Sequence, residues 1–182
     1  MDGGQFNRFF GGAVLEQGTF SAPDSGFAYF EGNYAGLVNV GAPIDPGNGA
    51  PDVVTPSGVG EVFGSVYLVA DFTDNATEGT IYDRQADVGG GFVELDDLVL
   101  INTSIEADGT FEGDIELGDL SGAGSYTGAF GGEDATFVGG IVALNDGAYQ
   151  GDFPDDADTS NLQEYGLFVI GQCDPNSCFG AP

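Results

Sequence analysis

An aromatic residue followed two positions later by a glycine recurs along this chain, and that spacing is typical of β-strands. The six pairs are Phe30 with Gly32, Tyr34 with Gly36, Phe111 with Gly113, Tyr126 with Gly128, Phe130 with Gly132, and Tyr149 with Gly151. Because side chains alternate across a pleated sheet, both members of a pair lie on one face, where the glycine leaves room for a ring from a neighbouring strand. The pattern favours a tightly curved antiparallel sheet or a closed barrel.

Residues 109–117 show the alternation of a strand with one buried face. The apolar face carries Phe111, Gly113, Ile115 and Leu117, and the polar face carries Thr110, Glu112, Asp114 and Glu116. Another β-rich run, residues 98–105, precedes this strand, and Asp108 and Gly109 supply the turn of a hairpin. The two segments are therefore expected to pair antiparallel.

The same patterns predict strands along most of the remaining chain. They are expected at residues 13–20, 26–38, 62–72, 78–82, 123–130, 135–144, 148–151 and 167–171, with a turn at 145–147. No segment keeps the apolar spacing of a long amphipathic helix. The chain is predicted to be all-β, a single antiparallel up-and-down barrel of about eight strands with long acidic and proline- and glycine-rich loops.

One domain is expected over residues 1–182, because 41% hydrophobic and 12% aromatic content is enough for a core despite 33 glycines. Residues 1–25 are predicted to be an amino-terminal strand or plug that includes Phe6, Phe9 and Phe10. Residues 41–60 contain four prolines and are predicted to be a long surface loop. Residues 151–164 are predicted to be an acidic loop, and residues 172–182 a tail closed by a disulfide.

The charge balance excludes several partners. Thirty acidic residues stand against Arg8 and Arg84, with no lysine, and the formal net charge is −28. Such a chain repels nucleic acid and anionic membranes. Halophilic or marine adaptation explains the charge, because salt screens self-repulsion. No stretch approaches the roughly 20 apolar residues of a membrane span. Met1 is not followed by an export signal, so we expect that a signal, and with it a lipid anchor, was removed upstream.

Cys173 and Cys178 flank the turn-forming residues 174–177, which would bring the two thiols close enough to bond. A disulfide implies an oxidising compartment. Because the closed loop is short, its contribution to stability is expected at the low side of about 2 to 4 kcal/mol. The ring fastens the chain end or presents a binding loop.

Residues 124–140 resemble the barrel signature of the transferrin-binding protein B family. The matched positions are Tyr126, Gly128, Phe130, Gly131, Ala135, Gly139 and Gly140. Upstream, the run from Val69 to Phe72, the later Gly79 and the segment around Phe111 resemble the family's preceding elements. The chain departs from the family pattern at Gly132, where the family has proline, and at Phe137 or Val138, where it has an acidic residue.

The resemblance implies a small antiparallel barrel and a non-catalytic binding role. Family members are surface lipoproteins, secreted or anchored at the outer membrane of Gram-negative bacteria, where they capture host proteins or other ligands through surface loops. The resemblance therefore implies an extracytoplasmic location and a protein or metal-bearing ligand. No transferrin-contacting residue is assigned to this chain.

Few residues here support catalysis. The chain has no histidine, so Ser-His and Cys-His mechanisms are excluded, no catalytic residue is assigned, and the chain is not expected to be an enzyme. No cofactor is expected other than calcium, whose candidate ligands are Asp152, Asp155, Asp156 and Asp158, with Asn161. A solvated acidic loop is the alternative for this cluster.

Three functional hypotheses remain open from the sequence. The favoured one is a binding module that uses residues 41–60 and 152–161 to reach a basic or metal-bearing partner. The second is a structural or protective surface protein without a dedicated ligand. The third is a glycoside hydrolase that uses two carboxylates across a cleft.

Overall fold

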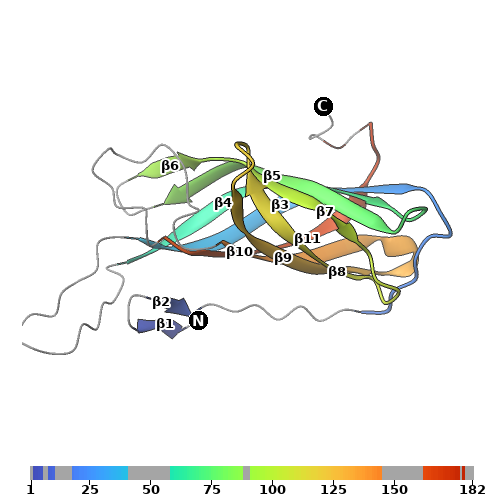
Figure 1. The fold of residues 1–182 in the computed structure, drawn as a ribbon, viewed down its shortest axis with the longest axis horizontal. Helices are drawn as coiled ribbons and strands as arrows, with labels where there is room; N and C mark the ends of the chain where they lie inside the picture. The colour runs from blue at the N-terminus through green and yellow to red at the C-terminus, as the bar shows by residue number, and fades with distance from the viewer. Residues whose placement is uncertain are drawn as a thin grey trace, which may run out of the picture.

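The computed structural model describes residues 2–5, 8–10, 18–40, 58–87, 91–144, 162–176 and 178. Eight antiparallel strands form a closed barrel, and one further strand, β6 (Phe92–Leu95), pairs with the last four residues of β5 (Figure 1). The barrel strands are β3 (Phe27–Val40), β4 (Gly58–Asp71), β5 (Ala76–Asp87), β7 (Leu98–Ser104), β8 (Thr110–Leu117), β9 (Gly122–Gly131), β10 (Phe137–Leu144) and β11 (Glu164–Cys173). The predicted all-β barrel is confirmed.

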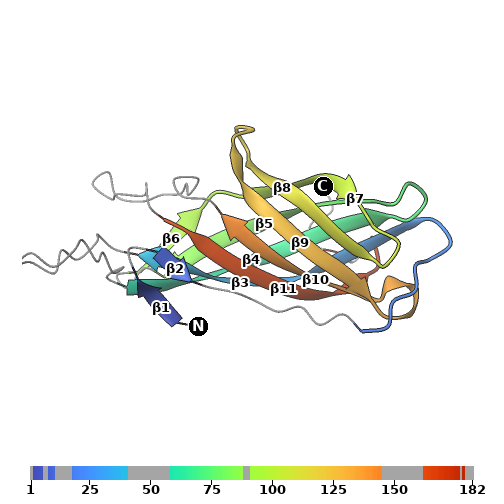
Figure 2. The ribbon, with the colours of Figure 1, turned by 60° about the horizontal axis from the view of Figure 1, so that its bottom comes forward.

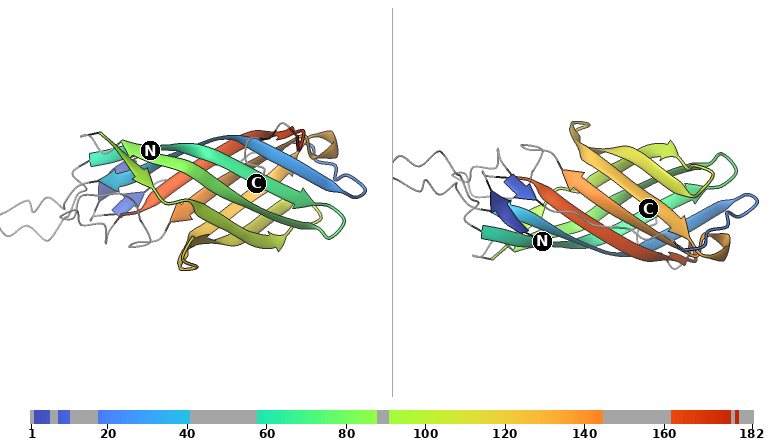
Figure 3. Two further views of the ribbon diagram at one scale, coloured as in Figure 1. Left: turned by 90° about the horizontal axis from the view of Figure 1, so that it is seen from above. Right: turned by 90° about the horizontal axis from the view of Figure 1, so that it is seen from below.

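The barrel is an up-and-down meander. Each of its strands pairs with the next along the chain, and β3 pairs with β11 to close the cylinder. The strands run obliquely to the long axis of the molecule (Figures 2 and 3). A separate two-stranded sheet joins β1 (Asp2–Gln5) and β2 (Arg8–Phe10). In the described part of the chain, no helix has the length and apolar character needed to cross a membrane.

Several predicted boundaries were wrong. Strand β6 was not predicted, and β5 continues beyond Tyr82 to Asp87. The predicted loop 41–60 overlaps the start of β4 at Gly58, and the predicted acidic loop 151–164 overlaps the start of β11 at Glu164. The predicted tail from residue 172 overlaps the end of β11 at Cys173. The predicted strand 148–151, the turn 145–147, most of the loop 41–60 and most of the acidic loop lie outside the described residues.

Two further corrections concern short segments at one end of the barrel. Of the predicted strand 13–20, only residues 18–20 are described, and there Phe20 forms an isolated bridge with Gly132. The predicted strand 135–144 starts two residues late, because Glu133–Ala135 form a 3₁₀ turn. Backbone geometry explains this turn: φ is +55° at Asp134 and +52° at Ala135, a left-handed conformation that interrupts a strand.

The core follows from the aromatic and glycine spacing. In the register of β8 and β9, Phe111 lies opposite Gly128, and Gly113 lies opposite Tyr126. A methyl group on Gly128 would come within 2.3 Å of the Phe111 ring, and one on Gly113 within 2.6 Å of the Tyr126 ring. Each strand therefore supplies both a ring and the gap for its neighbour's ring, as the spacing predicted.

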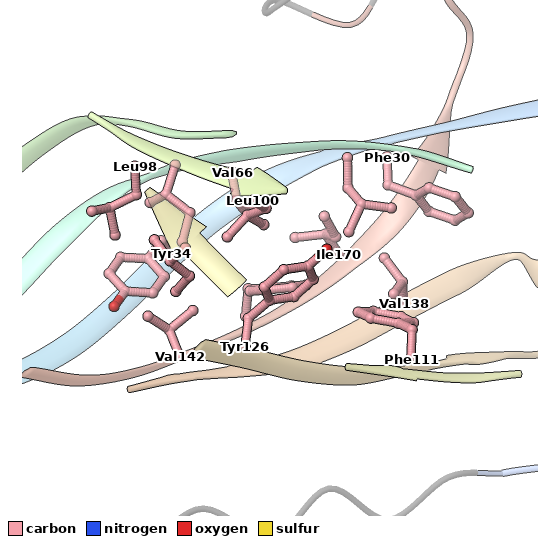
Figure 4. Packing of buried hydrophobic residues seen from close by; sticks show 14 of the residues in the cluster. Phe30, Tyr34, Val66, Leu98, Leu100, Phe111, Tyr126, Val138, Val142 and Ile170 are labelled. Atoms are coloured by element: carbon pink, nitrogen blue, oxygen red, sulfur yellow. The ribbon is translucent and has the colours of Figure 1, made fainter. Parts of the chain in front are cut away.

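The same interlocking continues around the interior. Tyr34 lies over Gly166, and Phe168 lies over Gly140. Phe130 has its ring centroid 5.5 Å from Phe30 and 5.2 Å from Phe111. Side chains from strands on all sides point inward and fill the barrel (Figure 4). The interior is a packed core rather than a channel.

Candidate functional site

The two ends of the barrel differ in what emerges from them. At one end, β3 begins and β11 ends, beside the Cys173–Cys178 disulfide, and we call this end the disulfide rim. At the opposite end, the far rim, β3 ends at Val40, β4 begins at Gly58, β10 ends at Leu144 and β11 begins at Glu164. Both long segments that the sequence singled out for binding, 41–57 and 145–161, therefore leave and rejoin the barrel at the far rim.

A buried ionic network lies inside the barrel toward the far rim. Arg84 Nη2 donates to Glu164 Oε2 at 2.7 Å, and Tyr34 Oη donates to Glu164 Oε1 at 2.6 Å. The side chains of Arg84 and Glu164 are 2% and 0% exposed. Arg84 also donates to the backbone oxygen of Asp96. The network thus joins β3, β5 and β11 and the link between β6 and β7.

A β-bulge turns Arg84 into the barrel. Opposite Gly64, the register of β4 and β5 shifts, and Asp83 takes a left-handed φ of +50°. Strict alternation from the buried Ile81 would place Asp83 inside and Arg84 outside. The extra residue reverses the alternation, so that Arg84 and Ala86 are buried and Asp83 is exposed.

Polar contacts also fasten the start of β11 at the far rim. Asn39 is buried, its backbone N–H donates to the oxygen of Gln163 at 3.2 Å, and its Oδ1 accepts from the Gln163 N–H at 2.6 Å. Glu164 follows directly. The start of β11 is therefore held by two hydrogen bonds between Asn39 and Gln163 and by the buried ion pair between Glu164 and Arg84.

The disulfide rim carries an aromatic and acidic surface on the outside of the barrel. Phe27 and Tyr29 on β3 stack with ring centroids 6.4 Å apart, and Cys173 lies opposite Tyr29. Cys173 and Cys178 form the predicted disulfide. A concave site of about 410 Å³ lies here, and the residues that line it include Phe27, Tyr29, Gln172, Cys173, Asp174 and Pro175.

Glu31 lies beside this site, on the same outer face. It accepts a hydrogen bond from Tyr82 Oη at 2.7 Å, and its carboxylate lies within 4.8 Å of both cysteine sulfurs. These three residues are the one group in the described part with the spacing of metal ligands. Both sulfurs are held in the disulfide, so the group does not provide a metal site in this state.

We expect Tyr82 to ionise late in an alkaline titration. Burial is the largest cause, and the hydrogen bond to Glu31 the next, of a rise in the pKa of Tyr82 from 10.0 to about 12. As the pH rises, the unfolded chain loses the Tyr82 proton at a lower pH than the folded chain does. The contribution of protonated Tyr82 to the stability of the fold is therefore complete below pH 10 and is lost as the pH rises through about 12. The ultraviolet absorbance of phenolate measures the titration, and Tyr82→Phe should remove part of its late component.

The matched control is Glu31→Gln, which removes the charge that opposes ionisation of Tyr82. The late component should then move to lower pH without disappearing. A late component that is unchanged in Tyr82→Phe would contradict the assignment. Burial also raises the pKa values of Tyr67 and Tyr126, so part of the late component should persist in both variants.

The residues that the sequence singled out fall into three groups. The candidate calcium ligands Asp152, Asp155, Asp156 and Asp158, with Asn161, lie outside the described residues, so calcium remains untested. The cysteines are bonded. The family-motif residues lie in the wall and core between β9 and β10, where Tyr126 Oη donates to the Ile101 backbone oxygen and Gly131 packs under the Phe137 ring.

Sequence reasoning missed both the ionic network and the outer aromatic surface. The one available signal for the network was the rarity of basic residues, because the sequence has only two arginines and no lysine beside thirty acidic residues. Among the described residues, Glu164 is the one buried carboxylate, and it is held by Arg84 and Tyr34. The described interior therefore does not present the two facing carboxylates that a glycoside hydrolase uses.

Solved structures similar to this chain are those of transferrin-binding protein B. A mutant of the vaccine antigen from Haemophilus parasuis Hp5 is 16% identical, covers 83% of this chain and 27% of its own, and has a TM-score of 0.48. Intact Ap-TbpB, with N and C lobes, is 14% identical over 83% and 27% of the two chains, with a TM-score of 0.49. The isotype 1 protein from serogroup B Neisseria meningitidis is 13% identical over 84% and 26%, with a TM-score of 0.44.

This chain spans about a quarter of the length of those structures. Residues 124–140 resemble the same family, and the barrel itself is established by the strand pairing. No protein-family model matches the chain, and no curated protein matches it.

Proposed function

We propose that this chain is a non-catalytic, extracytoplasmic binding module that captures a protein or metal-bearing ligand at the far rim. The observation that carries the proposal is topological: segments 41–57 and 145–161 both connect strands that end at that rim. A closed barrel holds those strand ends at fixed positions, and binding residues are often carried by long connections on such a scaffold. The module is proposed to act outside the cytoplasm of a Gram-negative bacterium, secreted or at the outer-membrane surface.

Charge sets the kind of partner. A net charge of −28 attracts a basic or metal-bearing surface and accelerates its encounter with the module. Asp152, Asp155, Asp156 and Asp158 are proposed to meet that partner, with calcium as a candidate ligand. The disulfide fits an oxidising compartment. The similar structures are named for binding transferrin, but transferrin is not proposed as the ligand of this chain.

The test is to scramble residues 42–57 and residues 152–161 separately, so that composition and charge stay the same. Immobilised wild-type and scrambled chains are exposed to the organism's own medium in concentrated sodium chloride, and the retained proteins are identified by mass spectrometry. The proposal expects a specific protein to be retained by the wild-type chain and lost from at least one scrambled chain that keeps its circular dichroism spectrum.

The matched control changes the opposite rim without changing its charge, with Glu106→Asp and Ala107→Ser in the turn between β7 and β8. This variant should retain the same protein as the wild-type chain. Retention that survives both scrambles would refute the proposed location of the site. If the wild-type chain retains nothing beyond what the scrambled chains retain, a structural or protective role replaces the proposal.

A further inference from the structure

The concave site at the disulfide rim is chemically distinct from the far rim. Phe27 and Tyr29 give it an aromatic wall, and the Phe27 side chain is 62% exposed. Covering this exposed ring with a ligand would remove apolar surface from water. The two rings have an interplanar angle of 27°, and both residues line the site of about 410 Å³.

Carboxylates border the same site. Asp174 is one of its lining residues, and Glu31 lies beside the neighbouring disulfide. Asn176 donates two hydrogen bonds to Asp174 Oδ1, at 2.8 Å from its backbone and 2.9 Å from its side chain, and these bonds lower the pKa of Asp174. Asp174 therefore keeps its charge well into mildly acidic solution.

The chain as a whole is strongly acidic, with a formal net charge of −28. Arg84 is the one described basic side chain, and it is buried in the barrel with Glu164. A site with aromatic faces, flanking carboxylates and a negative surrounding field is complementary to an organic cation. A guanidinium fits this combination best, because it is planar, stacks on rings and bonds to carboxylates.

We propose that this site binds the arginine side chain of a basic polypeptide, with the guanidinium stacked on Phe27 and Tyr29 and directed toward Asp174. The site lies at the opposite end of the barrel from the strand ends that segments 41–57 and 145–161 connect, and its occupant is independent of the function proposed for the far rim. It is a second contact surface, which allows one partner to be held along the barrel or two partners to be held at once.

The experiment titrates the isotopically labelled chain with N-acetyl-arginine amide and follows backbone amide shifts by NMR in concentrated sodium chloride. Salt suppresses the general attraction of any cation to this acidic chain. The shifts should gather at residues 27–31 and 172–176. The neutral isostere N-acetyl-citrulline amide should cause little change there, and equal shifts with both compounds would overturn the proposal.

Two pairs of matched variants separate the site from nonspecific charge. Phe27→Leu should raise the Kd about two- to fivefold, whereas Phe92→Leu, which is similarly exposed at 66% on β6, should not change it. Asp174→Asn should weaken binding to a similar degree, and Asp97→Asn, which removes the same charge from another exposed position, should not. Equal effects within either pair would assign the binding to the bulk charge or to apolar surface in general.

A last comparison tests whether the occupant is a polypeptide. A glycine- and serine-flanked peptide with one central arginine should bind at least as tightly as N-acetyl-arginine amide. Weaker binding of the peptide would mean that the site excludes a chain and takes a free small cation, against the proposal. The chain with residues 152–161 scrambled should bind both probes normally, and loss of binding there would place the arginine site in the acidic segment instead.

Discussion

Replacing Arg84 with methionine is expected to lower the free energy of unfolding by about 3 to 5 kcal/mol, because it leaves a buried carboxylate without its cation. Glu164 is 0% exposed, and of its hydrogen bonds from Arg84 and Tyr34 it would keep only the one from Tyr34. Methionine fills a similar volume, so the loss of packing is small. Urea unfolding followed by circular dichroism in concentrated sodium chloride measures the effect.

The double variant Arg84→Met with Glu164→Gln separates loss of the ion pair from loss of the arginine itself. Glutamine is neutral and still accepts the Tyr34 hydrogen bond, so the double variant should recover more than half of the stability lost in the single variant. Glu61→Gln removes a charge from an exposed position on β4 and should change stability by less than about 0.5 kcal/mol. A double variant as unstable as the single variant would show that the charge pair is not the cause.

The ionic network also marks the limit of what the sequence could predict. Alternation is a local signal, and it placed Phe111, Ile115 and Leu117 correctly because β8 keeps its period along the residues that face the core. In β5 the period breaks at Asp83, and neither Asp83 nor its two neighbours on β5 is a glycine or proline that would mark the bulge. Strict alternation would therefore assign Arg84 to solvent, when it is buried.

The surface at the disulfide rim was missed for a different reason. The aromatic and glycine pattern selects inward rings, such as Phe30 and Tyr34, and the intervening Tyr29 and Glu31 carry no pattern of their own. Tyr29 lies opposite Cys173 because β3 pairs with β11 on one side. Glu31 reaches Tyr82 because β3 pairs on its other side with β4, and β4 pairs in turn with β5. Such contacts between distant parts of the chain follow from barrel closure and register, which the sequence predicted only as a fold class.

The relative placement of the two long segments could have been predicted from less information. In an up-and-down barrel, every second connection joins strands at the same end, so the number of strands between 41–57 and 145–161 decides whether the strand ends that they connect share a rim. The sequence prediction placed a strand at 148–151, which lies outside the described residues, and it did not predict β6. The observed strand bounds settle this point, because β3 and β10 end at the far rim and β4 and β11 begin there.

Replacing Gly128 with alanine is expected to destabilise the barrel by about 3 kcal/mol, because the added methyl group has no space on either side. It would lie 2.3 Å from Cζ of Phe111 and 2.6 Å from the backbone oxygen of Gly139. The Phe111 ring cannot retreat easily, since its centroid lies 6.0 Å from that of Tyr126 and 5.2 Å from that of Phe130. Relief would require movement of the β10 backbone as well as of a packed ring.

Gly122 provides a control on the same strand, because a methyl group there meets nothing within 4 Å. Gly122→Ala should change the free energy of unfolding by less than about 0.5 kcal/mol, or raise it slightly by restricting the unfolded chain. Phe111→Leu shortens the ring that faces Gly128, so its combination with Gly128→Ala should cost less than the sum of the two single losses. Equal stability of the two alanine variants would mean that β9 does not need glycine opposite Phe111, and the interlocking of rings with glycines would then not be what determines the width of the barrel.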